Sequence, residues 1–529
     1  MQIKSDSKQE SFMRGKKMGI CTIAAIYIGT YEVSLKLFEV NSKKKMKEID
    51  HVRIRINLGK DAFNEGRLGY ELVDELCDIL AEFQKIAKTY RVESCEVCAG
   101  AVLRVISNKL FVLDQIRQRT GFSVKVLSNS EHRFISYHSV ASDENFEKMI
   151  QNSAAIVDVG GASVQITLFK KGHLVTTQHL EMGTMRLYSL LNNRAHGEAS
   201  YEKQLDEYIN KRLEVFRSLY LSDGVEYMII IGDYSNDILK KLAKHQIEPN
   251  VVRAEKFVKY IAKLQKHNVE EISAQLNLSN DKDPLIEPSM ALFKGMIHNL
   301  GADIVWAPGV NINDGIAYNF ALYKKWLKLN HDFEQDIKDA AHGLSMHYNS
   351  YSSHIEALTG LSTQIFDAMK KVHGLGNRQR LLLEVAAILH DCGKYVSLND
   401  SARCAYHIIM SSEIIGLSHL EREIVARTVL YNSIPLDEYE AISDKLDKES
   451  FLVVAKLSAI LRVANALDQS HKQKFDKIQI ALKTKELVIT VQSFDDISLE
   501  QALFDSKTAY FENVYSIKPV LKEKRVYNY

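Results

Sequence analysis

The spacing of apolar and polar residues divides the chain into an alternating α/β part and a helical part. An apolar run that begins at Cys21 passes through a turn at Gly29 into two further strand patterns that reach Leu58. Apolar residues then recur at helical spacing from Tyr70 to Tyr90, and short strands and helices alternate to about residue 325. Such alternation is typical of α/β domains.

The pattern changes in the C-terminal part of the chain. Long helical periods run from Phe333 to about Asn465. Two alternating segments, Lys477 to Leu482 and Leu487 to Val491, predict a hairpin that is followed by a last helix and strand. We therefore predict a disordered tail at 1–18, α/β domains at 19–140 and 141–328, a helical domain at 329–474 and a small α+β domain at 475–529.

One pattern occurs twice in the α/β part. The strand that ends at Thr30 leads into the alternating segment Val33 to Phe38, and the strand that ends at Ser163 leads into Val164 to Phe169. Each copy is an apolar strand, a glycine turn with a hydroxyl residue, and a second strand. Two such hairpins predict a duplicated α/β domain with a cleft between the halves.

Composition and charge exclude several classes of protein. Of 529 residues, 46% are hydrophobic and 26% charged, so disordered and collagen-like chains are excluded, and six cysteines do not make a disulfide framework. Lys and Arg number 68 against 67 Asp and Glu, so bulk charge requires neither nucleic acid nor a membrane as partner. No segment reaches the ~18 to 20 apolar residues of a spanning helix. We expect a cytoplasmic protein.

The glycine turns point to phosphate chemistry. Glycine accepts positive φ and leaves no side chain in the way, so backbone amides at such a turn can converge on an anion. Asp158 stands at the end of its strand, placed to hold Mg²⁺, and Ser163 can donate to a phosphate oxygen. Two tight hairpins with no ligand are the alternative, but a matched pair favours a phosphate clamp.

The segment Asp158-Val-Gly-Gly-Ala-Ser163 resembles the second phosphate motif of the exopolyphosphatase and guanosine pentaphosphate phosphohydrolase (Ppx/GppA) family, which has the actin-like ATPase fold. The likeness covers most of the chain. It includes a strand-to-helix segment with Arg, a loop with Glu, a further strand and a closing glycine segment, at residues 99–104, 127–134, 180–187 and 307–315.

The resemblance implies a fold class and an activity. The fold would be α/β, with duplicated actin-like (ribonuclease H-like) domains followed by an all-α HD-type domain and a small α+β tail. The activity would be release of terminal phosphate from inorganic polyphosphate, or from guanosine pentaphosphate, with Mg²⁺ as cofactor. Glu131 would be the general base and Asp158 the magnesium ligand. Phosphate would be bound by Gly29, Thr30, Arg104, Gly160, Gly161 and Ser163, with Arg133 and Arg186 as further cations.

Three positions depart from the family pattern. Tyr27 stands where the family usually has Asp, Gln165 where it usually has Glu, and Gly100-Ala101 where it has Thr-Ser. A phenol is a poor Mg²⁺ ligand at neutral pH and an amide adds no charge. We therefore expect magnesium to bind this chain more weakly, unless the phosphate chain brings its own.

The helical domain has a second candidate site. His390-Asp391 follows a helix from Leu381 to Leu389, and His354 lies on an earlier helix. This is similar to the HD phosphohydrolase arrangement, in which His, His-Asp and a distant Asp hold a metal. Asn465 stands where the distant Asp is expected, and Asp468 lies three positions further. The resemblance implies a second divalent metal; a structural hydrogen bond is the alternative.

Other functions stay open at this point. A protein that binds polyphosphate or a nucleotide without turnover would suit the neutral residues Tyr27, Gln165 and Asn465. A nucleotide phosphohydrolase could instead use His390 and Asp391. An actin-like sugar kinase is disfavoured, because the chain lacks a recognisable adenosine loop. We expect no nucleic-acid or membrane partner, and the sequence leaves open whether the chain forms a homodimer.

Overall fold

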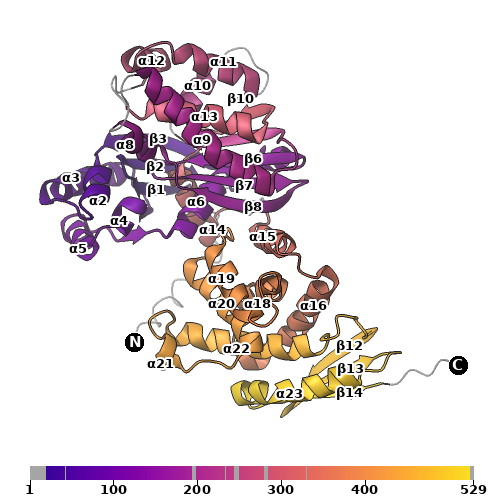
Figure 1. The fold of residues 1–529 in the computed structure, drawn as a ribbon. Helices are drawn as coiled ribbons and strands as arrows, with labels where there is room; N and C mark the ends of the chain where they lie inside the picture. The colour runs from indigo at the N-terminus through magenta and orange to yellow at the C-terminus, as the bar shows by residue number, and fades with distance from the viewer. Residues whose placement is uncertain are drawn as a thin grey trace. The chain divides into compact units, whose positions relative to one another are not determined.

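The computed structural model describes residues 20–41, 43–192, 198–232, 234–242, 250–278, 284–328 and 331–524 (Figure 1). The tail expected at 1–18 lies outside these residues. The chain forms two compact units. Unit 1 comprises Met1–His173 and Gln178–Asp332, and unit 2 comprises Leu174–Thr177 and Phe333–Tyr529.

Two mixed sheets, which belong to unit 1 except for residues 174–177, repeat one strand order. The first runs β3-β2-β1-β4-β5, from strands Met46–Arg55, Glu32–Val40, Cys21–Ile28, Ser94–Ala99 and Val124–Val126. The second runs β10-β11-β9-β6-β7-β8, from strands Val251–Arg253, Ile304–Trp306, Tyr227–Gly232, Ser153–Val159, Val164–Lys170 and His173–Leu180.

The two sheets confirm the predicted duplication. In each sheet the first strand pairs antiparallel with the second and parallel with the fourth, which are β4 and β9 respectively. The hairpins read from the sequence are β1–β2 and β6–β7. In each of these hairpins a glycine turn joins the two strands. The two turns therefore occupy equivalent positions of the repeated fold.

Helices cover both sheets. Figure 1 shows α2 to α5 gathered beside the first sheet and α10 to α13 beside the second. The helices of unit 1 are α2 (Leu58–Asn64), α3 (Tyr70–Thr89), α4 (Ala101–Arg104), α5 (Lys109–Thr120), α6 (Asn129–Ala141), α7 (Phe146–Ile150), α8 (Thr184–Asn192), α9 (Glu198–Tyr220), α10 (Ser235–Leu242), α11 (Ala254–Leu264), α12 (Val269–Leu276), α13 (Ile286–Leu300) and α14 (Ile312–Tyr323).

The hydrophobic core of the first sheet includes an apolar central strand and an amphipathic helix. Residues 23–26 of β1 have no exposed surface, as a central strand with an uninterrupted apolar run requires. Leu76, Leu80 and Phe83 of α3 are fully buried in the same core. The helical spacing of apolar residues from Tyr70 thus marked the face of α3 that packs on the sheet.

The last helix of unit 1 returns to the first sheet. Asn313 of α14 donates from Nδ2 to the carbonyls of Ala25 (2.8 Å) and Ser34 (3.2 Å), and the Ser34 hydroxyl donates to Asn313 Oδ1 (2.9 Å). Asp314 pairs at 2.8 Å with Lys36 of β2. Although residues 141–328 were assigned to the second domain, α14 is joined to the strands of the first.

Unit 2 is helical and ends in a small sheet. The helices are α15 (Phe333–His347), α16 (Ser352–Ala368), α17 (Lys370–His373), α18 (Asn377–Leu389), the 3₁₀ turn η1 (Cys392–Tyr395), α19 (Ser401–Ser411), α20 (His419–Ser433), α21 (Tyr439–Ile442), α22 (Lys448–Ala466) and α23 (Ser498–Tyr515). The hairpin predicted at 477–491 is confirmed as β12 (Lys477–Leu482) and β13 (Glu486–Gln492), and β14 (Lys518–Glu523) joins β13 in parallel.

None of the helices in the described part of the chain is long and apolar enough to cross a membrane.

Removing the Asn313 side chain should destabilise unit 1. Asn313→Ala leaves the buried carbonyls and hydroxyl that Asn313 contacts without their partner, and each such group costs about 1–3 kcal/mol. We expect the free energy of unfolding, measured by urea denaturation, to fall by roughly 2 kcal/mol or more. Tyr323→Ala, at an exposed position later in the same helix, is the comparison and should be nearly neutral. Equal stability of Asn313→Ala and the unaltered protein would contradict this role.

Candidate functional site

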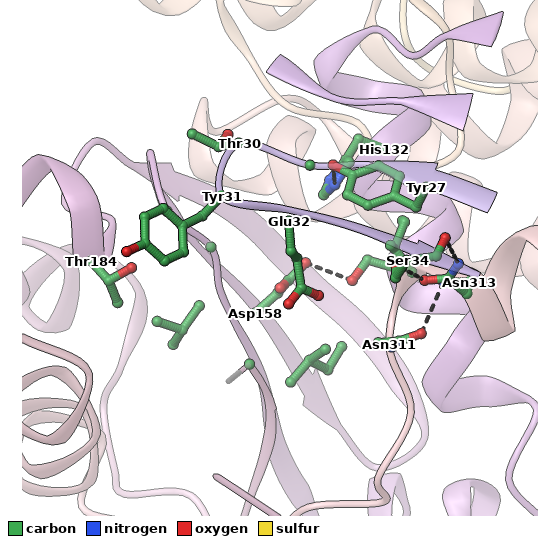
Figure 2. Close-up of a pocket in the computed structure, with 18 of the residues that line it drawn as sticks. Tyr27, Thr30, Tyr31, Glu32, Ser34, His132, Asp158, Thr184, Asn311 and Asn313 are labelled. Atoms are coloured by element: carbon green, nitrogen blue, oxygen red, sulfur yellow. Dashed lines mark hydrogen bonds between the residues drawn. The ribbon is translucent and has the colours of Figure 1, made fainter. Parts of the chain in front are cut away.

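A cleft of about 460 Å³ lies in unit 1 where the two hairpins face each other. Figure 2 shows Tyr27, Thr30 and Glu32 from the first hairpin together with Asp158 from the second. The start of α6 and the turn before α14 complete the wall. Of the residues predicted from the sequence, those that line the cleft are Gly29, Thr30, Arg104, Arg133, Asp158, Gly160, Gly161 and Ser163.

Asp158 is the cleft carboxylate with a neutral partner. The Ser136 hydroxyl of α6 donates to Asp158 Oδ2 at 2.6 Å. Burial raises the pKa of Asp158 to about 6, against the opposing effects of Ser136 and the Arg133 guanidinium. Gln165 is directly opposite Asp158 in the β6–β7 register. Its Oε1 is buried without a hydrogen-bond partner, so two oxygen acceptors stand side by side at the end of this hairpin.

Two other cleft carboxylates, Glu32 and Glu48, are neutralised by cations. Arg53 donates to both oxygens of Glu32, at 2.7 to 3.2 Å. Lys36 lies 2.8 Å from Glu48 and is itself buried. A carboxylate that is bound to a guanidinium or ammonium has little charge left to attract a second cation. Asp158 is therefore better placed than Glu32 or Glu48 to act on a ligand.

The hairpin glycines shape the turns, and the residues after them offer amides. Gly29 N–H donates to the Glu32 carbonyl (2.9 Å) and Gly160 N–H to the Ser163 carbonyl (3.0 Å), which closes each turn. Within the described residues, no hydrogen bond is donated by the backbone amides of 30–31 and 161–162. Amides at two facing turn tips make a suitable concavity for anions. Of the predicted cradle residues, Thr30 and Gly161 have such amides, whereas the Gly29 and Gly160 amides are used within the turns.

Two predicted arginines reach the cleft and one does not. Arg104 donates to the Leu127 carbonyl at 2.6 Å and lines the cleft, as does the buried Arg133. Arg186 pairs with Glu181 at 2.8 Å, is half exposed and is not among the lining residues. Of the three arginines predicted from the sequence, Arg104 and Arg133 therefore line the cleft.

Glu131 does not line the cleft. Its carboxylate accepts from the Ser128 amide (3.0 Å) while the Ser128 hydroxyl accepts from the Glu131 amide, which forms the capping box of α6. Lys125 lies 2.8 Å from the same side chain. Burial alone would raise the pKa of Glu131, but the hydrogen bonds from Lys125 and Ser128 outweigh it and lower the pKa. Glu131, which the resemblance implies as the general base, therefore caps α6, because the pattern Ser-x-x-Glu forms a capping box.

The residue after Glu131 faces the cleft instead. His132 Nε2 lies 2.9 Å from the Tyr27 hydroxyl, and Figure 2 shows the two side chains pointing toward each other. Burial and the nearby Arg104 and Arg133 lower the pKa of His132 to about 4. Sequence reasoning missed His132. Asn129 and His132 are three positions apart in the first turn of α6 and so lie on one face, and this helical spacing could have identified His132.

Unit 2 brings three of its four predicted ligands together. Candidate ligand atoms of His354, His390 and Asp391 all lie within 4.8 Å of one another, and all three residues are buried. Asp468 takes a different place, because its Oδ2 lies 2.7 Å from His354 Nδ1 and its carboxylate also accepts from Gln473. Asp468 thus orients His354 and is not a fourth member of the cluster, contrary to the sequence-based expectation.

Comparison with known proteins identifies the family. The Ppx/GppA phosphatase family pattern matches residues 38–324, and that of Ppx/GppA phosphatase domain III matches 338–508. The chain belongs to the Ppx/GppA phosphatase family. It is accordingly a hydrolase of phosphoanhydride bonds, and the duplicated sheets of unit 1 are the actin-like α/β fold of that family.

Individual members of the Ppx/GppA family are only distantly similar in sequence. The guanosine-5'-triphosphate,3'-diphosphate pyrophosphatase of Aeromonas hydrophila is 21% identical over 450 residues, which are 81% of this chain and 84% of that protein. The crystal structure of the Aquifex aeolicus Ppx/GppA family member covers 59% of this chain and 100% of its own, with a TM-score of 0.49 and 18% identity. The crystal structure of an exopolyphosphatase from Cytophaga hutchinsonii covers 58% of this chain and 99% of its own, with a TM-score of 0.49 and 17% identity.

Matched amide variants should separate the two candidate carboxylates. Glu131→Gln keeps the capping box, since Gln serves at this position, and loses only a partly exposed contact with Lys125. We expect its turnover of a phosphoanhydride substrate to stay within about three-fold of the unaltered protein. Asp158→Asn removes the charge that faces the cleft and should lower turnover by about 100-fold or more.

Orthophosphate release and thermal unfolding of both variants provide the check. If Glu131→Gln abolishes turnover while Asp158→Asn retains it, the sequence-based assignment of Glu131 as the base is right and Asp158 is not the carboxylate that acts on the substrate.

Proposed function

We propose that the cleft of unit 1 hydrolyses the terminal phosphoanhydride bond of inorganic polyphosphate, with guanosine pentaphosphate as the second candidate substrate. The observation that carries this proposal is the convergence on one cleft of two facing turn tips, the cations Arg104 and Arg133, and the carboxylate of Asp158. Polyphosphate is preferred because the sequence segment from Gly232 to Asn236 lacks the Gly-Thr richness of the family's nucleotide-facing loop.

The residues of the chain bind the substrate and orient the water. The turn amides and the two arginines hold the oxygens of the last phosphates and spread their negative charge. Asp158 orients a water molecule toward the terminal phosphorus. The water oxygen then forms a bond to that phosphorus while the bond to the bridging oxygen breaks, and the electron pair leaves on the shortened chain. One water proton passes to solvent, and orthophosphate is released.

The cleft fits a magnesium ion that arrives with its substrate. Mg²⁺ is usually held by one or two carboxylates together with substrate phosphates. Asp158 and the unpartnered Gln165 Oε1 are neighbouring oxygen donors of this kind. They would hold the ion together with phosphate oxygens, and the ion would supply charge neutralisation and Lewis acidity.

The first test is orthophosphate release from long-chain polyphosphate with Mg²⁺, with guanosine pentaphosphate as the competing substrate. We expect release from polyphosphate and a loss of about 100-fold in Arg133→Gln, which removes a buried charge from the cleft wall. Arg186→Gln, outside the cleft, should behave as the unaltered protein. Binding of polyphosphate without any release would contradict the proposal and favour a sensor.

A second candidate function belongs to unit 2, where two buried imidazoles present unpartnered nitrogens. His390 Nδ1 donates to the Ala387 carbonyl (2.7 Å), so its Nε2 carries a lone pair, which faces Asp391 Oδ1 at 3.1 Å. Burial lowers the pKa of His390 to about 4, so the imidazole is neutral near pH 7. Two electron-rich atoms at this distance repel each other unless a cation lies between them.

The other histidine of unit 2 has the same polarity. His354 Nδ1 faces the Asp468 carboxylate, which accepts, so its Nε2 also carries a lone pair and has no partner. A metal-bound histidine commonly holds its second nitrogen to a carboxylate in this way. Lys394 donates to Asp391 Oδ2 at 2.7 Å, which leaves Oδ1 directed at His390. We propose that His354, His390 and Asp391 Oδ1 bind a divalent transition metal, for which two imidazoles and a carboxylate are suitable ligands. A bound metal would support hydrolysis of a phosphate ester at a second centre.

Metal titration of the full chain tests this centre. After treatment with a chelator, the protein should bind one equivalent of Zn²⁺ or Mn²⁺ by calorimetry in the absence of any phosphate. His390→Ala should lose this binding, and Asp468→Asn should weaken it by about 10- to 100-fold through the orientation of His354. His267→Ala, an exposed histidine of unit 1, is the matched control. Equal binding by His390→Ala and the unaltered protein would refute the assignment.

The remaining expectations are still predictions from the sequence: a cytoplasmic location, no nucleic-acid or membrane partner, and a homodimer as an open possibility. The HD-type character of the helical domain also stays a prediction.

A further inference from the structure

The two equivalent hairpins present different chemistry to the cleft. Tyr27 is paired with Ser34 near the end of β1. Asp158 is paired with Gln165 at the same place in β6. Each of the two inward residues precedes its hairpin glycine by two positions. The second half of unit 1 therefore ends in oxygen acceptors, whereas the first half ends in a phenol, which can donate a hydrogen bond.

The phenol of Tyr27 occupies a place that is built for it. Its hydroxyl lies 2.9 Å from His132 Nε2, and the two rings are 5.7 Å apart and tilted by 50°. A Cβ at position 100 would overlap the Tyr27 hydroxyl. Gly100 begins α4 with a negative φ of −91°, so its backbone conformation does not require glycine, and the space taken by the phenol does.

The surroundings keep the pair neutral. Burial and the negative charge of Asp158 raise the pKa of Tyr27, so the hydroxyl keeps its proton near neutral pH. The imidazole of His132 is uncharged there, because its pKa is lowered to about 4. When the imidazole carries its proton on Nε2 it donates to the phenol oxygen, and the phenol O–H is then free to donate to an anion. A second carboxylate at this point would repel both Asp158 and the phosphate.

We propose that Tyr27, oriented by its contact with His132, donates a hydrogen bond directly to a phosphate oxygen of the substrate. The phosphate would then lie between hydrogen-bond donors from the first half of unit 1 and the ion-binding oxygens of the second half. This inference rests on the proposed function of the cleft. Tyr27 and Arg104 would bind the phosphate without a metal, while Asp158 and Gln165 would face the ion. The two departures from the family pattern at Tyr27 and Gly100 would then act together with His132.

Calorimetric binding of inorganic tripolyphosphate, with EDTA and separately with Mg²⁺, tests the proposal without turnover. In EDTA, Tyr27→Phe should bind about ten-fold more weakly, since it loses one hydrogen bond to a charged group. Tyr27→Asp should bind more weakly still in EDTA, because its carboxylate repels the anion, and should recover with Mg²⁺ more than Tyr27→Phe does. Tyr90→Phe, whose hydroxyl contacts Asp50 away from the cleft, should bind as the unaltered protein.

A second set of variants checks the geometry. Gly100→Ala should weaken metal-free binding as much as Tyr27→Phe, because the added Cβ displaces the hydroxyl. The double variant Gly100→Ala/Tyr27→Phe should be about as weak as Tyr27→Phe alone, since the overlap with the hydroxyl is gone and the remaining 3.1 Å contact with the ring carbon needs only a small shift. The effects of His132→Leu and Tyr27→Phe should likewise be non-additive.

The outcomes separate the inference from the proposed function. Unchanged metal-free binding by Tyr27→Phe, in a protein that binds tripolyphosphate, overturns the role of Tyr27 and leaves the cleft as the phosphate site. No binding of tripolyphosphate by the unaltered protein in either condition overturns the proposed function, and the inference with it.

Discussion

The cleft of unit 1 depends on a buried ion pair that joins the first sheet to the last helix of the unit. Lys36 of β2 has almost no exposed surface, and its ammonium lies 2.8 Å from both Asp314 and Glu48. A buried ammonium without such partners would be very costly, so β2 and α14 must come together when the chain folds. Asp314 also accepts from the Asn311 amide and caps α14, which places the turn before that helix in the cleft wall.

The duplicated fold carries a cleft whose two sides differ in their residues. Duplication brings equivalent strand ends to the two sides of the cleft, and the residues at those ends then set the chemistry of each side. Asp158 and Gln165 present oxygen acceptors on one side, and on the other side Tyr27 presents a hydroxyl that contacts His132. A phosphate chain that carries a magnesium ion has both kinds of group, so it matches both sides at once.

In unit 2, the candidate ligand Asp468 contacts another candidate ligand, His354. Asp468 has the charge of a metal ligand, yet its carboxylate is occupied by His354 Nδ1 and by two donors of Gln473. Burial alone would raise the pKa of Asp468, but these contacts outweigh it and lower the pKa, so the carboxylate stays ionised and fixes the imidazole. His471 and Gln473 have φ values of 55° and 47°. The His471 amide donates to the Asp468 backbone carbonyl, and the Gln473 amide donates to the Asp468 carboxylate. Backbone strain of this kind is common beside functional sites.

The sequence by itself determined the order of elements, the duplicated hairpins, the helical second half and the family. These features follow from periodicity and from motif order, which are local properties of the chain. It also identified Asp158, Arg104 and Arg133 as cleft residues, because each lies in a recognisable segment. Only the tertiary structure shows that His132 lines the cleft while Glu131 caps α6, since adjacent positions on a helix point in different directions. The pairing of Tyr27 with His132 and the space left by Gly100 join residues that are far apart in the sequence, and packing alone brings them into contact.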